Sequence, residues 1–103
     1  MAVLTINVAG SERSWGHEEE ASISTTPTLL APSATSRVTK VVIQVLEQDL
    51  IIRDDGNDPT LTRGLILRVG DIFVVEAYYA TLLLLKGIAR TGTSKVRTSY
   101  YGY

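Results

Sequence analysis

The densest group of side chains that could do chemistry lies between residues 54 and 58. Here Asp54, Asp55, Asn57 and Asp58 put four oxygen-bearing side chains within five residues. Such oxygens are the ligands that Ca²⁺ prefers, so a Ca²⁺ site is one interpretation. The spacing does not fit the EF-hand loop, which needs acidic or amide residues at alternate positions and a later glutamate. Asp and Asn also favour turns because they hydrogen-bond their own backbone. We therefore interpret the segment mainly as a turn whose acids face solvent or a partner.

A second candidate group surrounds His17, the one histidine of the chain, which precedes Glu18, Glu19 and Glu20. A metal site usually draws its ligands from more than one place in the sequence, and this run offers only one place. A Ser–His–Asp triad would need His17 to be held rigidly, but the surrounding segment has no regular periodicity. The run is interpreted as a solvated charged segment, and no metal site is predicted.

Two pairs of carboxylates, Asp54 with Asp58 and Asp71 with Glu76, are the remaining candidates for acid–base chemistry. A hydrolase with paired carboxylates needs a defined separation between them, and the sequence does not set one. The sequence contains no glycine-rich phosphate loop of the Walker or dinucleotide-binding type. We therefore expect no enzymatic activity and predict no catalytic residue and no cofactor.

Composition limits the class of protein further. The chain has 103 residues, ten basic and eleven acidic side chains, and no cysteine. This balance lacks the clustered positive charge of nucleic-acid-binding proteins, and disulfides and thiolate metal sites are excluded. The first residues have no secretory pattern, and the apolar run Leu82–Leu85 is too short to span a membrane. We expect a protein made in the cytoplasm, with neither nucleic acid nor membrane as a partner.

The elements that position these residues are predicted to be strands. Val, Ile and Thr make up nearly a third of the chain, and β-branched side chains favour strands. Apolar alternation and turn residues predict strands at 38–46, 50–53, 65–67, 72–77, 87–90 and 95–101. Asp54–Thr60 is predicted as a turn, and Arg68–Asp71 as a tight turn of the hairpin kind. Residues 78–85 continue as extended chain or contain a helical turn at 82–85. This pattern indicates an all-β protein, a small antiparallel β-sandwich or jelly-roll-like barrel.

The N-terminal third has a different texture. Residues 2–8 alternate like a strand, but residues 11–36 are rich in Ser, Thr, Pro and Glu and lose periodicity. We therefore predict an extended N-terminal arm over residues 1–36 and a β-sandwich domain over residues 37–103. The arm is interpreted either as a mobile tail or as a segment ordered on a neighbouring subunit. Trp15 favours the second interpretation, because an isolated Trp is a natural anchor for a partner pocket.

The residues predicted to contact partners are apolar or aromatic. They are Trp15, Leu29 and Leu30 in the arm, and Tyr101 and Tyr103 near the end of the chain. Tyr is favoured at interfaces because it offers a large rigid surface with a polar tip.

An ordered series of turn residues carries a resemblance to a known group of proteins. The series comprises Ile52–Gly56, Asp58–Thr60, Gly64, Leu67, Gly70–Asp71 and Ser99–Gly102. In this order the C-terminal two thirds, from about Val38 to Gly102, resembles small structural proteins of tailed bacteriophage virions. The N-terminal third does not share the pattern, and the group has no defined catalytic residues that could be assigned to this chain.

The resemblance implies a virion protein. The leading interpretation is a capsid decoration, or cement, protein that binds the major capsid protein and copies of itself and stabilises the shell. A head–tail connector or a tail or fibre adaptor subunit is the alternative in the same setting. A carbohydrate- or Ca²⁺-binding β module that uses Asp54, Asp55 and Asp58 is the alternative from another class.

Overall fold

The computed structural model describes residues 13–103, with side chains from residue 20 onward. These residues form eight strands and one short helix. The bounds are β1 Arg13–Ile23, β2 Thr28–Leu29, β3 Val38–Glu47, β4 Leu50–Arg53, β5 Leu65–Leu67, β6 Ile72–Glu76, α1 Tyr79–Leu82, β7 Lys86–Ala89 and β8 Ser94–Gly102. The prediction of an all-β chain is confirmed.

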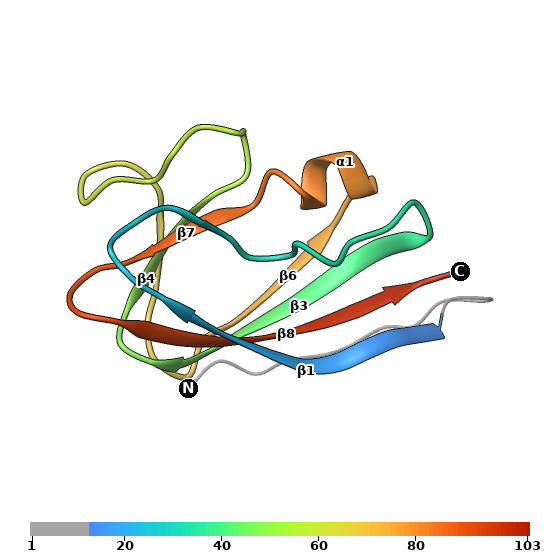
Figure 1. The fold of residues 1–103 in the computed structure, drawn as a ribbon, viewed down its shortest axis with the longest axis horizontal. Coiled ribbons are helices and arrows are strands. Elements are labelled where there is room, and N and C mark those ends of the chain that lie inside the picture. The colour runs from blue at the N-terminus through green and yellow to red at the C-terminus, as the bar shows by residue number, and fades with distance from the viewer. Residues whose placement is uncertain (1–12) are drawn as a thin grey trace.

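The strands form two antiparallel sheets of four strands each (Figure 1). The first sheet has the order β1-β8-β3-β6, and the second has the order β2-β7-β4-β5. The pairs β1–β8, β2–β7, β3–β6 and β4–β5 are those of one long hairpin with eight strands. Wrapping this hairpin around itself brings β8 beside β3 and β7 beside β4. That order is the jelly roll, the double-sheet architecture with eight strands.

The core lies between the sheets and follows the strand alternation. In the first sheet Val41, Ile43 and Val45 of β3 share the inward face, as the sequence predicts. Strand β8 alternates buried and half-buried residues from Ser94 to Ser99, as a strand with one face on the core should. The second sheet contributes inward residues that include Leu50, Ile52 and Leu67. The predicted strands from residue 38 onward are therefore confirmed.

The prediction of an irregular arm is wrong for residues 13–36. Strand β1 pairs with β8 along the first sheet, although its ladder has two irregularities. Ile23, Leu30 and Ala31 are buried in the core. The Leu30 amide donates to the Leu85 carbonyl (3.0 Å), and the Thr98 hydroxyl donates to the Leu30 carbonyl (3.0 Å). These residues belong to the sandwich because their apolar side chains close one side of its core. The predicted strand at residues 2–8 lies outside the described residues.

Two local predictions are also corrected. Residues 68–71 form a tight turn, in which the Asp71 amide donates to the Arg68 carbonyl (2.9 Å). This turn connects β5 in one sheet to β6 in the other, so it is not a hairpin turn. Residues 78–85 are not extended, because α1 begins at Tyr79 and places Leu82 and Leu85 inward. Within residues 13–103, no helix is long and apolar enough to cross a membrane.

Candidate interaction surface

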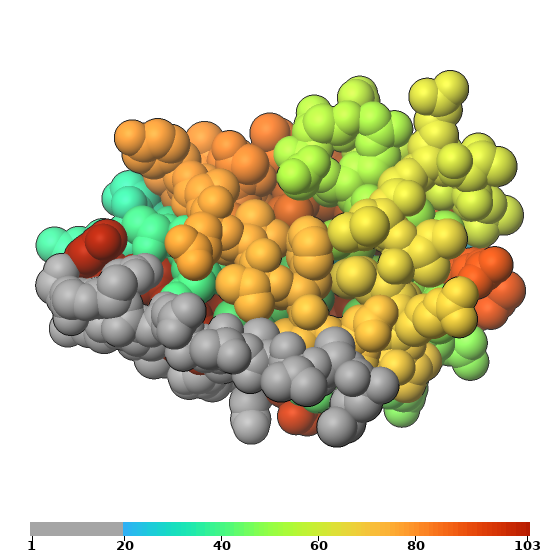
Figure 2. All heavy atoms as spheres, turned by 180° about the vertical axis from the view of Figure 1, so that it is seen from behind, coloured from blue at the N-terminus to red at the C-terminus, as the bar shows by residue number. Residues whose placement is uncertain are grey.

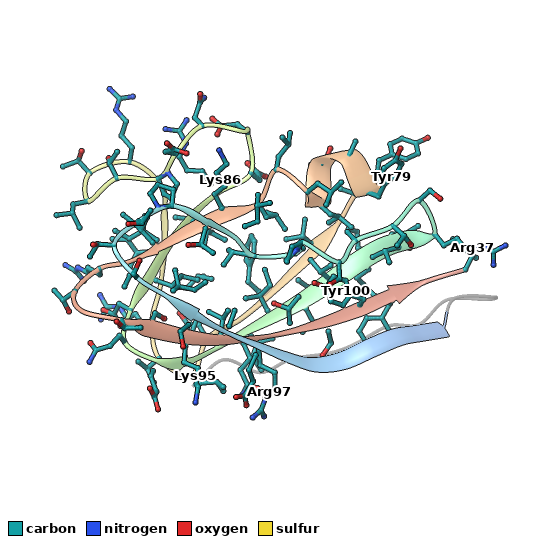
Figure 3. All side chains as sticks on the ribbon, viewed as in Figure 1. Arg37, Tyr79, Lys86, Lys95, Arg97 and Tyr100 are labelled. Carbon is teal, nitrogen blue, oxygen red and sulfur yellow. The ribbon has the colours of Figure 1, made fainter. Side chains whose placement is uncertain are left out.

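The acidic turn between β4 and β5 is held by side chains of opposite charge. Both carboxylate oxygens of Asp55 accept hydrogen bonds from the Arg53 guanidinium, one of them from Nε at 3.2 Å. The Asn57 amide also donates to Asp55 (3.1 Å). Asp58 pairs with the Lys86 ammonium (3.1 Å), which lies at this end of the sandwich (Figure 3). The turn is therefore held by contacts within itself around Asp55 and by one ion pair to β7.

This network bears on the Ca²⁺ interpretation. A cation bound here would have to compete with Arg53 for Asp55 and with Lys86 for Asp58. Among the described residues, no group of three or more His, Cys, Asp or Glu side chains could hold a metal ion. The geometry therefore gives the Ca²⁺ interpretation no support, and the acids act as turn residues. The side chain of His17 lies outside the described part of the chain.

The Arg53–Asp55 pair changes the titration of both groups. Hydrogen bonds from the Arg53 guanidinium, and then from the Asn57 amide, hold the pKa of the Asp55 carboxyl well below its usual range. The same contact with Asp55 raises the pKa of Arg53. Because the pKa of Asp55 is depressed in the folded state, its contacts with Arg53 and Asn57 stabilise the fold. This contribution is fully present above the unfolded pKa of about 3.9. It is lost as the pH falls from there through the folded pKa.

Replacing Arg53 should therefore change the titration of Asp55. In Arg53→Gln, we expect the Asp55 midpoint to rise toward about 3.9, measured by ¹³C NMR of the carboxyl carbon. Glu20 is the control, because its pKa is lowered mainly by a hydrogen bond from Arg97, on another part of the surface. An Asp55 midpoint that does not move in the variant would show that Arg53 does not hold this carboxylate in solution.

The other carboxylate pair is too widely separated for the chemistry considered above. Asp71 precedes β6 and Glu76 ends it, so they are five residues apart along one strand. Strand rise puts them roughly 16 Å apart. The carboxyl groups of glycoside hydrolases lie within about 10 Å of each other. This pair therefore does not form a site of that kind.

Most of the exposed large apolar side chains belong to one stretch of the chain. Among the side chains from residue 20 onward, seven of the nine lie between residues 61 and 84: Leu61, Leu65, Ile66, Val69, Tyr78, Tyr79 and Leu84. This stretch forms β5, β6 and α1, and its yellow and orange atoms occupy much of the face in Figure 2. Tyr78 is 85% exposed and Leu65 is 51% exposed, and Tyr79 projects from α1 away from the sheets (Figure 3).

The topology explains why these side chains are exposed. Strands β5 and β6 are edge strands of the two sheets, so each has a neighbouring strand on only one side within the described residues. Leu65 and Phe73 from the two strands line one pocket together with Ile52, Arg53 and Asp54. Its volume is about 90 Å³, whereas ligand clefts measure about 300–1,000 Å³. The pocket is large enough for a single apolar side chain.

We define the β5–β6 surface as the exposed Leu65, Ile66, Val69, Tyr78 and Tyr79 together with the half-buried residues 72–75. Single exposed apolar residues are normal on proteins, whereas several along neighbouring edge strands are typical of a contact site. Sequence reasoning missed this surface, since it read these segments as ordinary strands of the sandwich. No sequence signal marks it, because the apolar run Ile72–Val75 of this edge strand resembles the run Leu50–Ile52 of the central strand β4.

The structure separates the interface residues predicted from sequence. Leu29 and Tyr103 are exposed and remain available to a partner. Leu30 is buried in the core, and Tyr101 is buried with its ring 5.4 Å from the Lys40 ammonium. Leu30 and Tyr101 have almost no exposed surface to offer, so their prediction as contacts is wrong for the free protein. Trp15 belongs to β1, but its side chain lies outside the described part.

No protein-family model, no curated protein and no solved structure matches this chain.

Proposed function

We propose that the protein is a structural component of a tailed-phage virion, a capsid decoration protein that binds the major capsid protein and copies of itself. The observation that carries the proposal is the concentration of exposed apolar side chains on the β5–β6 surface. Exposed apolar area of this kind is typical of protein–protein contact sites. The small pocket beside Phe73 suits an apolar side chain of a partner better than a small-molecule substrate.

The setting on a virion is supported by the resemblance and by the architecture. Jelly rolls recur in viral capsid proteins and in lectins. The residues that carry the resemblance coincide with structural requirements of this fold. Gly70 has a φ of +90° in the turn between the sheets. At Gly102, a Cβ atom would lie 1.8 Å from the Arg37 carbonyl oxygen.

Repeated weak contacts suit a protein of this size. A decoration protein binds a lattice of identical sites, so neighbouring copies increase one another's retention. The alternative role is a head–tail connector or a tail or fibre adaptor, which would use the same surface at few sites. The number of copies per particle separates the two roles.

Particles purified from cells infected by the phage that encodes the chain provide the first test. Quantitative mass spectrometry should find the protein at hundreds of copies per particle. Six or twelve copies would favour the connector or tail role. Absence from purified particles would overturn the proposal of a virion protein.

Substitutions on the β5–β6 surface test which residues bind. We expect Leu65→Gln with Tyr78→Ser to weaken retention on particles at least tenfold, because central apolar contacts contribute most of the binding energy. Retention is measured by rebinding purified protein to particles that lack it, and circular dichroism checks the fold.

The control pair is Leu29→Gln with Tyr103→Ser, which removes apolar area from exposed residues outside the β5–β6 surface. It should leave retention nearly unchanged. If only this control pair weakens binding, the contact lies at the residues predicted from sequence, and the β5–β6 surface is not the binding site.

A further inference from the structure

Strand β6 is an edge strand with little protection against pairing. Within the described residues it pairs with β3 on one side and with no strand on the other. Natural proteins protect such edges with Pro, Lys, bulges or covering segments. Residues 72–76 read Ile-Phe-Val-Val-Glu, and the ladder with β3 runs over five residues without a bulge. The strand is therefore regular, apolar except for Glu76 and able to accept another strand.

The hydrogen bonds to β3 identify which backbone groups of β6 point outward. The Ala77 amide donates to the Thr39 carbonyl (3.0 Å), and the Val45 amide donates to the Asp71 carbonyl (3.0 Å). Hydrogen-bonded residues alternate in an antiparallel ladder, so the odd-numbered residues of β6 bond to β3. The even-numbered residues Ile72, Val74 and Glu76 direct their N–H and C=O groups away from β3.

We propose that β6 pairs with β6 of a second copy of this chain, antiparallel and around a two-fold axis at Val74. In this register Val74 lies opposite Val74 of the second copy, and Ile72 lies opposite Glu76. All three are residues whose backbone groups point outward, so each pair exchanges two hydrogen bonds. The two first sheets then form one continuous sheet through the dimer.

The side chains are compatible with the same register. Phe73 and Val75 are partly buried and pack against the core. The register places Phe73 of one copy opposite Val75 of the other. Residues 72–75 are uncharged, and each Glu76 faces Ile72, so no like charges lie directly opposite. A two-fold contact of this kind uses one patch on both subunits, which is the commonest symmetry of soluble oligomers.

The area that a stable dimer buries is consistent with a contact over the β5–β6 surface. A stable interface covers about 800 Å² on each partner. The described protein has a surface of 5876 Å², so that is about one seventh of the whole. A strand edge of five residues offers less than this, and the exposed Leu65 and Tyr78 on the same surface supply further apolar area.

The proposal deepens the self-contact in the proposed function and rests on it only for the expectation that copies associate.

Disulfide trapping tests the register, because the chain has no native cysteine. Across the axis, the Cα atoms of two Val74 residues would be about 5.5 Å apart. A disulfide spans about 4.4–6.8 Å between Cα atoms. Most of the Val74→Cys protein should therefore form a disulfide-linked dimer, of twice 11.2 kDa, under mild oxidation. Ile72→Cys is the matched control on the same edge. Its two copies would be offset by four residues, roughly 13 Å, so it should stay monomeric on non-reducing gels.

Charge substitution gives a second measurement that does not depend on oxidation. Wild-type protein should sediment as a dimer at about 100 µM, and Val74→Lys should raise the dissociation constant at least tenfold, since two ammonium groups would meet at the axis. Mixing Val74→Lys with Val74→Glu should restore dimers, and circular dichroism checks that both variants fold.

Several results would overturn the proposal. They are a monomeric wild type, trapping of Ile72→Cys as efficient as that of Val74→Cys, or dimers that are insensitive to charge at residue 74. Dimers that depend on residues 1–12 instead of Val74 would identify the N-terminal segment as the occupant of the edge. A Val74 dimer that is absent from particles would contradict the proposed function alone, and a monomer that binds particles would contradict this inference alone.

Discussion

Leu30→Ala should lower the free energy of unfolding by about 2–5 kcal/mol, whereas Leu29→Ala should lower it by less than about 1 kcal/mol. Leu30 is 2% exposed and Leu29 is 41% exposed, although the two are neighbours in sequence. The Leu30 side chain packs against Gly87, where a Cβ atom would lie 3.0 Å from Leu30 Cδ2. Truncating Leu30 leaves a cavity that the backbone cannot close, since its amide and carbonyl are tied to Leu85 and Thr98.

Equilibrium unfolding in urea, followed by far-UV circular dichroism, measures this difference. A small domain has a total stability of about 5–15 kcal/mol, so the loss at Leu30 would be a large fraction of it. Equal and small losses in the two variants would mean that residues 13–36 are a dispensable arm, as the sequence suggests. A large loss confined to Leu30 would confirm that this segment is part of the core.

The strands from residue 38 onward could be predicted because each carries its own apolar pattern. Val41, Ile43 and Val45 alternate with the outward residues of β3, and this local spacing decides which face is buried. The pairing of these strands into a jelly roll could not be predicted, since it depends on contacts between distant segments. The acidic turn was predicted correctly because Asp, Asn, Gly and Pro act on their own backbone.

Strand β1 was missed because much of what holds it to β8 is backbone pairing, which depends on a strand far away in the sequence. At Glu20, the carboxylate accepts a hydrogen bond from the Arg97 guanidinium of β8 (2.6 Å) and lies 3.8 Å from the Lys95 ammonium. Of the described side chains of β1 only Ala21 and Ile23 are apolar and face the core, and two positions are too few to predict a strand. Lys95 and Arg97 project from the outer face of the first sheet in Figure 3, away from the second sheet.

The β5–β6 surface was missed for a different reason. The exposure of Leu65 and the half-burial of Phe73 follow from the edge positions of β5 and β6 in the two sheets. An apolar residue in a central strand and one in an edge strand have the same sequence signature. Only the order of the strands separates a buried residue from one that is available to a partner.

Gly64→Ala should be the second strongly destabilising substitution, with a loss of about 2–6 kcal/mol. Gly64 has a φ of +138°, and a residue with a side chain is strained there by about 1–3 kcal/mol. A Cβ atom at this position would also lie 2.6 Å from Ile51 Cγ2 and 2.9 Å from the Ile52 carbonyl oxygen. Ile51 is buried and stiff at χ1, so relieving the overlap would displace β4 and add about 1–3 kcal/mol.

Gly70→Ala separates these two costs. Gly70 also has a positive φ, +90°, but a Cβ atom there would meet nothing within 4 Å. It should therefore lose only the conformational part, about 1–3 kcal/mol, in the same urea unfolding experiment. The difference between the two variants measures the close approach of Gly64 to β4. Equal losses would show that β4 yields to the added methyl group, and that the glycine is required only for its backbone conformation.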